Sequence, residues 1–323
     1  MLGVTGCKYK SGYVTIVERS VVDGIEYHCD TELDKKTDCF YSIISKHPDS
    51  NGQVLRLRGK PECLAVSSRN NVIAIGILPM EGPNEYGYLY LSDKYEIVFA
   101  DTKTFKISHH WQVRPKGIPV PELDRLWRFD AMGFSDDGNT IATYYWKPNT
   151  DKGRQSVVTL WDVASGEPIQ ELFLPPPDTS LQGKVFTENA DDLAFSPDGR
   201  LVALSGGWFI KDPFGLISQP DPFVVIWKLS DGSRITLRPK NSPYISDLCF
   251  DQTATQLTCL GGTYGKITSK ANVTVWSVPE CELLTTKVVS GRVFGIMWST
   301  SENAFRVRLE DGTYLFVKHG VKE

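Results

Sequence analysis

One pattern of fifteen residues occurs four times in the chain and limits the folds that the chain can adopt. It is found in LAFSPDGRLVALSGG at 193–207, MGFSDDGNTIATYYW at 132–146, LCFDQTATQLTCLGG at 248–262 and LAVSSRNNVIAIGIL at 64–78. The four segments align without a gap. Each has an apolar run, a short polar turn and a second run rich in β-branched or apolar residues, which is typical of a β-hairpin. A repeat of this kind determines the fold as a whole.

Each hairpin is followed by a further extended run that contains an aromatic residue near its end. These runs are VTLWDVASGE (158–167), VVIWKLSDGS (224–233), VTVWSVPECE (273–282) and EIVFADTKTF (96–105). Another extended piece follows, such as IQELFL at 169–174. The repeating unit is therefore predicted to be a four-stranded antiparallel sheet. Since no segment has the periodicity of an amphipathic helix, the predicted fold class is all-β.

These repeats resemble those of the WD40 family of β-propellers. The resemblance covers about residues 61–318 and rests on the apolar run before SPDG at 196–199, the LSGG end of the second strand and a Trp that closes the third strand. Trp161-Asp162 preserves the dipeptide that names the family, whereas the family's Gly-His pair is absent. The resemblance implies a WD40-like β-propeller of four-stranded blades and a scaffolding or recruitment function.

A single propeller domain over residues 1–323 accommodates the repeats, because stacked sheets bury the faces that a lone sheet leaves exposed. Six blades are favoured, and the alternative is a seven-bladed protein of which this chain is a portion. The last blade offers only three strand-like runs, so we expect a strand within Leu2–Lys8 to supply the fourth and close the ring. The predicted blade boundaries are 10–60, 61–127, 128–190, 191–243, 244–290, and 291–323 together with 1–9.

The long connections between predicted strands all fall on one rim of the predicted propeller. The turns from first to second strand and from third to fourth strand are short. Those from second to third strand, and two Pro-rich links between blades, are long. Insertions on one face of a repeat array usually mark a binding face. The long segments are 79–95, 147–157, 208–223 and 263–272 between strands, and 114–127 and 174–190 between blades.

Three aromatic residues in the 208–223 segment are the first candidate binding residues. Trp208, Phe209 and Phe214 lie in the stretch GWFIKDPFG. Aromatic side chains in loops suit a role as binding anchors, because they bury a large area and have few rotamers to freeze. The alternative is that they fold inward and fill their own loop.

Two further aromatic residues, Tyr144 and Trp146, are candidates at the end of another predicted strand. Trp146 stands where the matching repeats carry Gly207 or Gly262, so Tyr144 and Trp146 either crowd the mouth of the central channel or pack in the core. By contrast, a Trp that closes the third strand of several repeats is predicted to be a core residue. The residues of this kind are Trp161, Trp227 and Trp276.

No catalytic, metal-binding or cofactor-binding residues are predicted. His109 and His110 are adjacent, so on a strand they point to opposite sides and cannot ligate one metal together. The Asp-Gly pairs lack the alternating acidic residues of a calcium loop and are explained as turns. No G-x-S-x-G nucleophile motif is present.

Charge and cysteine usage narrow the classes of partner and compartment. A net charge of −4 gives no general attraction to phosphate backbones, so nucleic acid is not expected as a partner. The seven cysteines form no C-x-x-C pair, the start lacks a secretory signal, and no apolar run approaches the ~18 residues of a membrane span. We expect an intracellular protein of the cytoplasm or nucleus that does not insert into a membrane.

The sequence thus predicts a non-enzymatic scaffold that binds a protein or peptide through the rim with the long loops, as a monomer or as part of a larger assembly. The alternative is a propeller enzyme or small-molecule binder with a central pocket on the same rim. An enzyme is expected to bring several titratable groups into one dry pocket, whereas a scaffold presents a broad surface with aromatic anchors.

Overall fold

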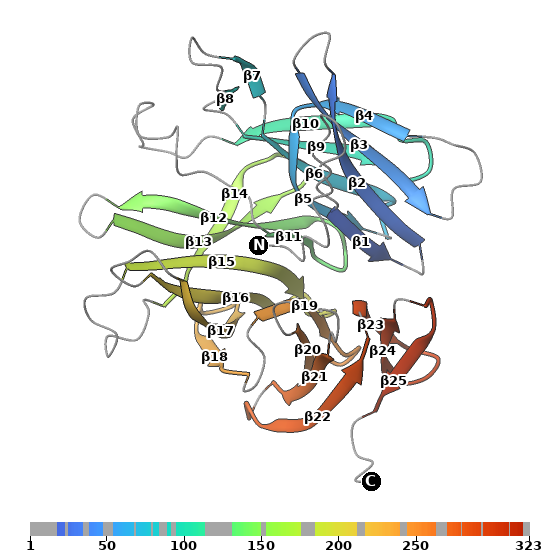
Figure 1. The fold of residues 1–323 in the computed structure, drawn as a ribbon, viewed down its shortest axis with the longest axis vertical. Coiled ribbons are helices and arrows are strands. Elements are labelled where there is room, and N and C mark those ends of the chain that lie inside the picture. The colour runs from blue at the N-terminus through green and yellow to red at the C-terminus, as the bar shows by residue number, and fades with distance from the viewer. Residues whose placement is uncertain are drawn as a thin grey trace. The chain divides into compact units, whose positions relative to one another are not determined.

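The computed structural model describes most of the chain between residues 18 and 318 (Figure 1). The described ranges are 18–22, 25–34, 39–47, 54–67, 69–78, 80–83, 89–91, 95–113, 131–149, 153–175, 185–211, 217–239, 244–262, 270–278, 280–291, 293–309 and 311–318. Within these ranges the chain is all-β. None of the described segments forms a helix that could cross a membrane.

The described chain forms two compact units, residues 2–173 and residues 174–323. The first unit has three four-stranded antiparallel sheets, with strand orders β1-β2-β3-β4, β10-β9-β6-β5 and β11-β12-β13-β14, and a small β7-β8 pair. Its strands are β1 (Glu18–Val22), β2 (Ile25–Asp34), β3 (Cys39–His47), β4 (Val54–Arg58), β5 (Lys60–Ser67), β6 (Val72–Leu78), β7 (Met80–Pro83), β8 (Leu89–Leu91), β9 (Tyr95–Asp101), β10 (Ile107–Val113), β11 (Ala131–Phe134), β12 (Thr140–Asn149), β13 (Gly153–Asp162) and β14 (Pro168–Phe173).

The second unit has two four-stranded sheets, β15-β16-β17-β18 and β19-β20-β21-β22, and three described strands of a further sheet, β23-β24-β25. The predicted closing strand within Leu2–Lys8 lies outside the described residues. The strands are β15 (Val185–Phe195), β16 (Leu201–Lys211), β17 (Ile217–Lys228), β18 (Arg234–Leu237), β19 (Tyr244–Phe250), β20 (Gln256–Gly262), β21 (Lys270–Ser277), β22 (Leu283–Ser290), β23 (Val293–Ser299), β24 (Ala304–Leu309) and β25 (Tyr314–Val317).

These sheets are consecutive in sequence and antiparallel throughout, which is the blade architecture of β-propellers. Within each unit, neighbouring sheets share a hydrophobic core. In the first unit, one core joins the β1–β4 sheet to the β10-β9-β6-β5 sheet, and another joins the latter to the β11–β14 sheet. In the second unit, the β19–β22 sheet packs against β15–β18 on one face and against β23–β25 on the other.

All four predicted hairpins are confirmed by their strand pairing, and the turns of three of them are closed by a backbone hydrogen bond of 2.9–3.0 Å, at 135–140, 196–201 and 251–256. In the 193–207 hairpin, Leu193 pairs with Leu204, the N–H of Ser196 donates to the carbonyl of Leu201 at 3.0 Å, and Gly199 has a φ of 67°. Glycine adopts this left-handed conformation at the lowest steric cost, because it has no Cβ. The Oγ of Ser196 donates to Asp198 at 2.6 Å, so the carboxylate stabilises the turn.

The predicted core tryptophans follow the same register. Trp161 and Trp227 are buried, and the indole N–H of Trp161 donates to Thr143 at 2.9 Å. Trp276 is only partly buried, although it packs against the core between the β15–β18 and β19–β22 sheets. The prediction is therefore confirmed in full for the first two and in part for Trp276.

Two segments that the sequence predicts as long loops are instead mostly strand. Residues 147–157 continue β12 and β13 as far as the pair Asn149 and Gly153. Residues 208–223 continue β16 and β17 as far as the pair Lys211 and Ile217. The strands continue because pairing satisfies backbone groups that a loop would leave to water. The register shifts between Trp208 and Ile210, so that β17 has one more residue than β16 at this point. The bulge contains Pro220, which has no backbone N–H to donate to the neighbouring strand.

We name the two ends of each sheet by their connections. The insertion end is the end at which the second strand joins the third, and it holds the β7-β8 pair and the extended β12–β13 and β16–β17 hairpins. The tight-turn end is the opposite end, where the first strand joins the second and the third joins the fourth.

The first strands of four sheets each contain a β-bulge at the equivalent position of the aligned repeats. The register shifts between Pro61 and Cys63, Ala190 and Asp192, Ile245 and Asp247, and Val293 and Gly295. Because a bulge adds one residue to its strand, it changes the direction in which the side chain after the bulge points. In the second unit, the side chains that follow two of these bulges are the carboxyl groups of Asp192 and Asp247.

Asp192 and Asp247 link each sheet of the second unit to the next. The backbone N–H of Leu248 donates to Asp192 Oδ2 at 2.7 Å, and that of Ile296 donates to Asp247 Oδ2 at 2.8 Å. The two carboxyl groups also hydrogen-bond to each other. Gly295 leaves room for this arrangement, because a Cβ there would lie 3.2 Å from Asp247 Oδ2.

Desolvation raises the pKa of both carboxyl groups, and the negative charge of Asp192 raises the pKa of Asp247 further, to well above the ordinary value of 3.8. Two carboxyl groups this close cannot both ionise easily, so the pair retains a shared proton. A pKa raised by folding means that the folded state binds more protons than the unfolded state. The contribution of the pair to stability is therefore present below the ordinary pKa and is lost as the pH rises through the raised pKa.

We predict that Asp247→Asn flattens the fall in unfolding free energy as the pH rises above about 4, because the amide has no proton to lose but still accepts from Ile296 and donates to Asp192. The variant should be more stable than the wild type at pH 8, as measured by urea denaturation at a series of pH values. Asp247→Ala should instead lose about 1–3 kcal/mol, because the Ile296 N–H loses its acceptor. Parallel pH profiles for Asp247→Asn and the wild type would contradict the shared proton.

Candidate binding site

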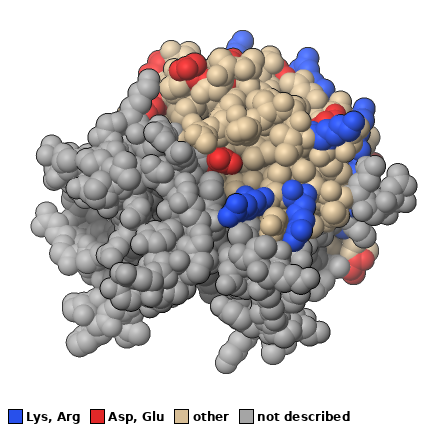
Figure 2. Space-filling model, turned by 90° about the horizontal axis from the view of Figure 1, so that it is seen from above, with Lys and Arg blue, Asp and Glu red and all other residues tan. Residues whose placement is uncertain are grey.

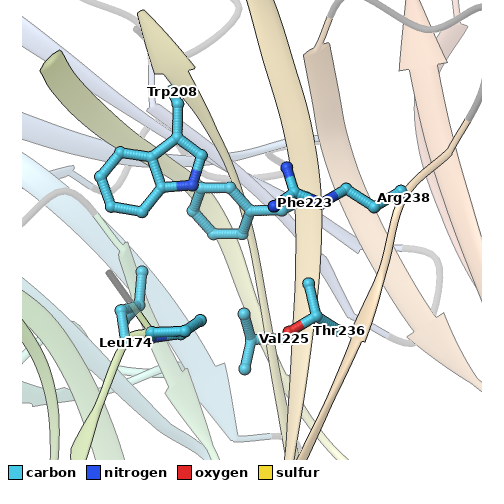
Figure 3. Close-up of a pocket in the computed structure, with 7 residues that line it drawn as sticks. Leu174, Trp208, Phe223, Val225, Thr236 and Arg238 are labelled. Carbon is cyan, nitrogen blue, oxygen red and sulfur yellow. The ribbon is translucent and has the colours of Figure 1, made fainter. Parts of the chain in front are cut away.

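A cavity of about 200 Å³ opens on the β15–β18 sheet of the second unit (Figure 3). The Trp208 and Phe223 rings lie along one side of the cavity, Leu174 and Val225 lie along another, and Arg238 reaches in from the β18 side. The residues that line it are Leu174, Pro175, Trp208, Phe223, Val225, Thr236 and Arg238.

The strand register explains why the floor of the cavity is aromatic. Phe223 on β17 pairs with Gly206 on β16, and Val225 pairs with Leu204. Because directly paired residues share a face, Gly206 contributes no side chain beside Phe223. The indole of Trp208, two residues farther along β16, lies against Phe223 with ring centroids 5.5 Å apart and a tilt of 39°. Both rings are buried, so the floor is a fixed apolar surface.

The rim of the cavity is polar and comes from the outermost strand of this sheet. Leu237 on β18 points into the core shared with the β19–β22 sheet. Residues that alternate with it along the strand point the other way. Thr236 is therefore exposed at the cavity, and so is Arg238, which directly follows β18. The Thr236 hydroxyl, the Arg238 guanidinium and the indole N–H of Trp208 are the polar side-chain groups of the lining.

The structure brings one of the five predicted binding residues to this cavity. Trp208 lines it, but Trp208 belongs to a strand and is 7% exposed, so it is not a loop side chain. Phe209 lies on β16 beside it, and its side chain and the whole of Phe214 lie outside the described residues. Tyr144 is fully buried and donates its hydroxyl to Ser156 Oγ at 3.1 Å, as the core alternative predicts. Trp146 is on β12, with its side chain outside the described part.

Sequence reasoning did not identify Phe223, Thr236 and Arg238. Phe223 falls within the segment predicted to be a loop, Thr236 lies on a strand with no distinctive motif, and Arg238 directly follows that strand. The available signal was the alternation in RITLR at 234–238, where apolar Ile235 and Leu237 separate the polar residues of the exposed face.

The adjacent histidines and the Asp-Gly turns have the following contacts. His109 stacks on Phe99 with centroids 4.4 Å apart, while His110 is exposed, so the two rings point apart as expected. Hydrogen bonds from the Ser135 hydroxyl and the Asn139 N–H lower the pKa of Asp137. The same kind of bond from Ser233 lowers the pKa of Asp231 to about 2. Among the residues that the structure describes, no three His, Cys, Asp or Glu side chains are grouped as metal ligands.

Charges of both signs occur together on the surface drawn in Figure 2. Lys and Arg side chains are scattered among uncharged residues on this face, with Asp and Glu side chains near them. The basic residues there do not merge into one continuous patch.

Comparisons with known proteins concern the fold. No protein-family profile matches the chain, and no curated protein matches it in sequence. It is similar in structure to hydrazine synthase from Kuenenia stuttgartiensis, with a TM-score of 0.52, 12% identity and coverage of 96% of this chain and 77% of that chain. Another similar structure is the β-propeller domain of the trilobed protease from Pyrococcus furiosus, with a TM-score of 0.48, 13% identity and coverage of 94% and 84%. At these identities the likeness extends to the fold alone.

We predict that Trp208→Ala lowers the unfolding free energy by about 3–5 kcal/mol, because it removes a buried aromatic side chain that packs on Phe223. Urea denaturation measures this loss. Thr236→Ala, which changes an exposed residue of the same cavity, should stay within about 0.5 kcal/mol of the wild type. An unchanged denaturation midpoint for Trp208→Ala would mean that the indole is not part of the core.

Proposed function

We propose that the protein is a non-enzymatic recognition propeller that binds a protein or peptide at the insertion ends of its sheets. The observation that carries the proposal is the difference between the two ends. The β7-β8 pair and the extended β12–β13 and β16–β17 hairpins, which add chain to three of the described sheets, all lie at the insertion ends of those sheets. Insertions on one side of a repeat array are typical of a binding face.

The tight-turn ends are constructed differently, which supports the proposal. The turns at 135–140, 196–201, 228–233 and 251–256 are each closed by a backbone hydrogen bond of 2.8–3.0 Å between their terminal residues. Asp and Ser side chains in these turns accept hydrogen bonds from backbone N–H groups of the same turn. The turns therefore have little freedom to change conformation around a partner. Recognition surfaces instead use longer segments that a rigid scaffold positions.

The finer architecture is part of the same proposal. Six blades of the WD40 type would account for the six consecutive sheets in the described residues, and a strand from Leu2–Lys8 would complete the β23–β25 sheet. The Trp residues at the ends of β13, β17 and β21, with Asp162 after the first, support this relationship. A scaffold of this kind acts alone or within a larger assembly.

The second candidate is a propeller enzyme or small-molecule binder. The cavity on the β15–β18 sheet favours it only weakly. Its volume of about 200 Å³ is below the ~300–1,000 Å³ of ordinary small-molecule sites. Arg238 is the titratable residue of its described lining, whereas acid–base chemistry usually needs several such groups together.

We predict that trimming the insertion ends removes partner binding but leaves the fold. One variant replaces residues 209–220 with Asn-Gly, which joins the paired residues Trp208 and Asp221. A second replaces residues 147–155 with Asn-Gly between the paired residues Trp146 and Ser156. Asn-Gly suits a two-residue hairpin turn, so the remaining register is kept. Proteins that co-purify with the wild type should fall by about tenfold or more with one or both variants in quantitative mass spectrometry.

Asp231→Ala, at the tight-turn end of the same sheet, is the matched control and should capture the same partners as the wild type. Urea denaturation of all variants shows that each is folded before capture is compared. If the trimmed proteins are folded and capture the same partners as the wild type, the insertion ends are not the binding surface.

A further inference from the structure

We propose that the cavity on the β15–β18 sheet is a pocket for one apolar side chain of a partner peptide in which acidic residues lie directly beside the apolar one in sequence. This inference rests on the proposed function, because it names the chemistry of the partner that the insertion ends recognise. Its parts are the aromatic floor of Trp208 and Phe223 and the polar rim of Thr236 and Arg238 (Figure 3).

The size of the cavity selects a side chain over a larger ligand. About 200 Å³ is too small for an ordinary cofactor or drug-sized molecule, whose sites occupy ~300–1,000 Å³. It is large enough for a single aliphatic side chain. Binding anchors in protein interfaces are typically single side chains that fill a preformed pocket near the centre of the contact.

The floor of the cavity is preformed and apolar. Phe223 and Val225 are 2% and 1% exposed, and Trp208 and Leu174 are also buried. Because these side chains are held by the core of the sheet, an incoming apolar group would find the surface already in place. It would pay little for ordering the pocket, and its own burial would provide most of the binding free energy.

The rim supplies charge complementarity to an acidic neighbour. The guanidinium of Arg238 carries five N–H donors, so it can bond a carboxylate in addition to other contacts. Thr236 places a hydroxyl beside it. Arg234, at the start of β18, is also exposed and lies on the same face of the strand as Thr236. It adds a second positive charge farther from the cavity. A peptide that enters the cavity with an apolar side chain thus meets the positive charge of Arg238 at the rim.

The cavity also lies at the end of the sheet where the proposed function places binding. Trp208 is the residue at which β16 begins to extend beyond the repeat pattern, and it pairs with Asp221 at the base of the extended hairpin. β18 runs from Arg234, opposite Trp227, toward the same end, so Arg238 lies there as well. An anchor in this cavity would hold a peptide against the extended β16–β17 hairpin.

The test uses the whole protein labelled with 5-fluorotryptophan and observed by ¹⁹F NMR. The chain has eight Trp residues, and Trp208→Phe assigns the resonance of the cavity. The probe is the capped peptide Ser-Gly-Leu-Glu-Glu-Gly. It should shift the Trp208 resonance with saturation and a dissociation constant on the order of 1 mM, as expected for one anchor. Exchange of its Leu for Ser should weaken binding by about tenfold or more.

Variants of the rim separate the charge contribution from the apolar one. Arg238→Gln should weaken binding of the Leu-Glu-Glu peptide by about three- to fivefold and leave the binding of a Leu-Gln-Gln peptide unchanged. Arg234→Gln is the matched control, because it makes the same change on the same strand away from the cavity lining, and it should have a smaller effect. Thr236→Phe, at an exposed strand position, should fill the cavity and abolish the shift.

Three results would overturn the inference. They are a Trp208 resonance that the Leu peptide does not move at about 10 mM, equal binding after Arg238→Gln, or a saturable shift with hexanoate and none with the peptide, which would indicate a small-carboxylate site. If trimming of the insertion ends abolishes partner capture while the peptide leaves Trp208 unmoved, the proposed function stands and this inference fails. If neither experiment has an effect, both are wrong.

Discussion

The need to bury both faces of every sheet is the constraint on which the rest of this structure depends. The middle strands meet it by sending alternate residues to different cores. On β6, Ile73 and Ile75 belong to the core with the β1–β4 sheet, whereas Ala74 belongs to the core with the β11–β14 sheet. On β20, Leu257 and Leu260 are divided between two cores in the same way. A sheet with this pattern is unstable alone, because one apolar face would always contact water. Neighbouring sheets within each unit are therefore required for stability, and this requirement explains why the chain repeats the same hairpin.

The sequence was sufficient to predict the hairpins because their signal is local. The turn at 196–199 contains the residues that its backbone needs, and the register follows from the apolar alternation on each side. The ends of the second and third strands were harder to predict. The repeat pattern stops at Gly207, but pairing continues to Lys211 because β17 offers a partner that no local pattern reveals. Tertiary pairing thus overrides a sequence that contains Pro220 and Pro222, and a bulge accommodates the residue that cannot donate.

The carboxyl pair and the cavity could not be predicted for a related reason. Asp192 and Asp247 occupy equivalent places in two repeats, but nothing in either repeat shows that a bulge turns them toward each other. The cavity combines residues that are far apart in sequence, from Leu174 to Arg238. Trp208 was recognised because aromatic residues are distinctive, whereas Thr236 and Arg238 gain significance only from their position beside it. Residue type was therefore a good guide to single anchors and a poor guide to the groups that surround them.

The floor and the rim of the cavity are subject to different physical demands. The floor is part of the hydrophobic core, so a change at Phe223 or Val225 alters folding as well as any ligand contact. The rim is exposed on the outermost strand of its sheet, where a side chain can change with little effect on stability. The core thus fixes the shape of the pocket, while the charge at its mouth is free to vary. In the binding mode that we propose, Trp208 and Phe223 would set the size of the side chain that the cavity accepts, and Arg238 would set the charge of the residues beside it.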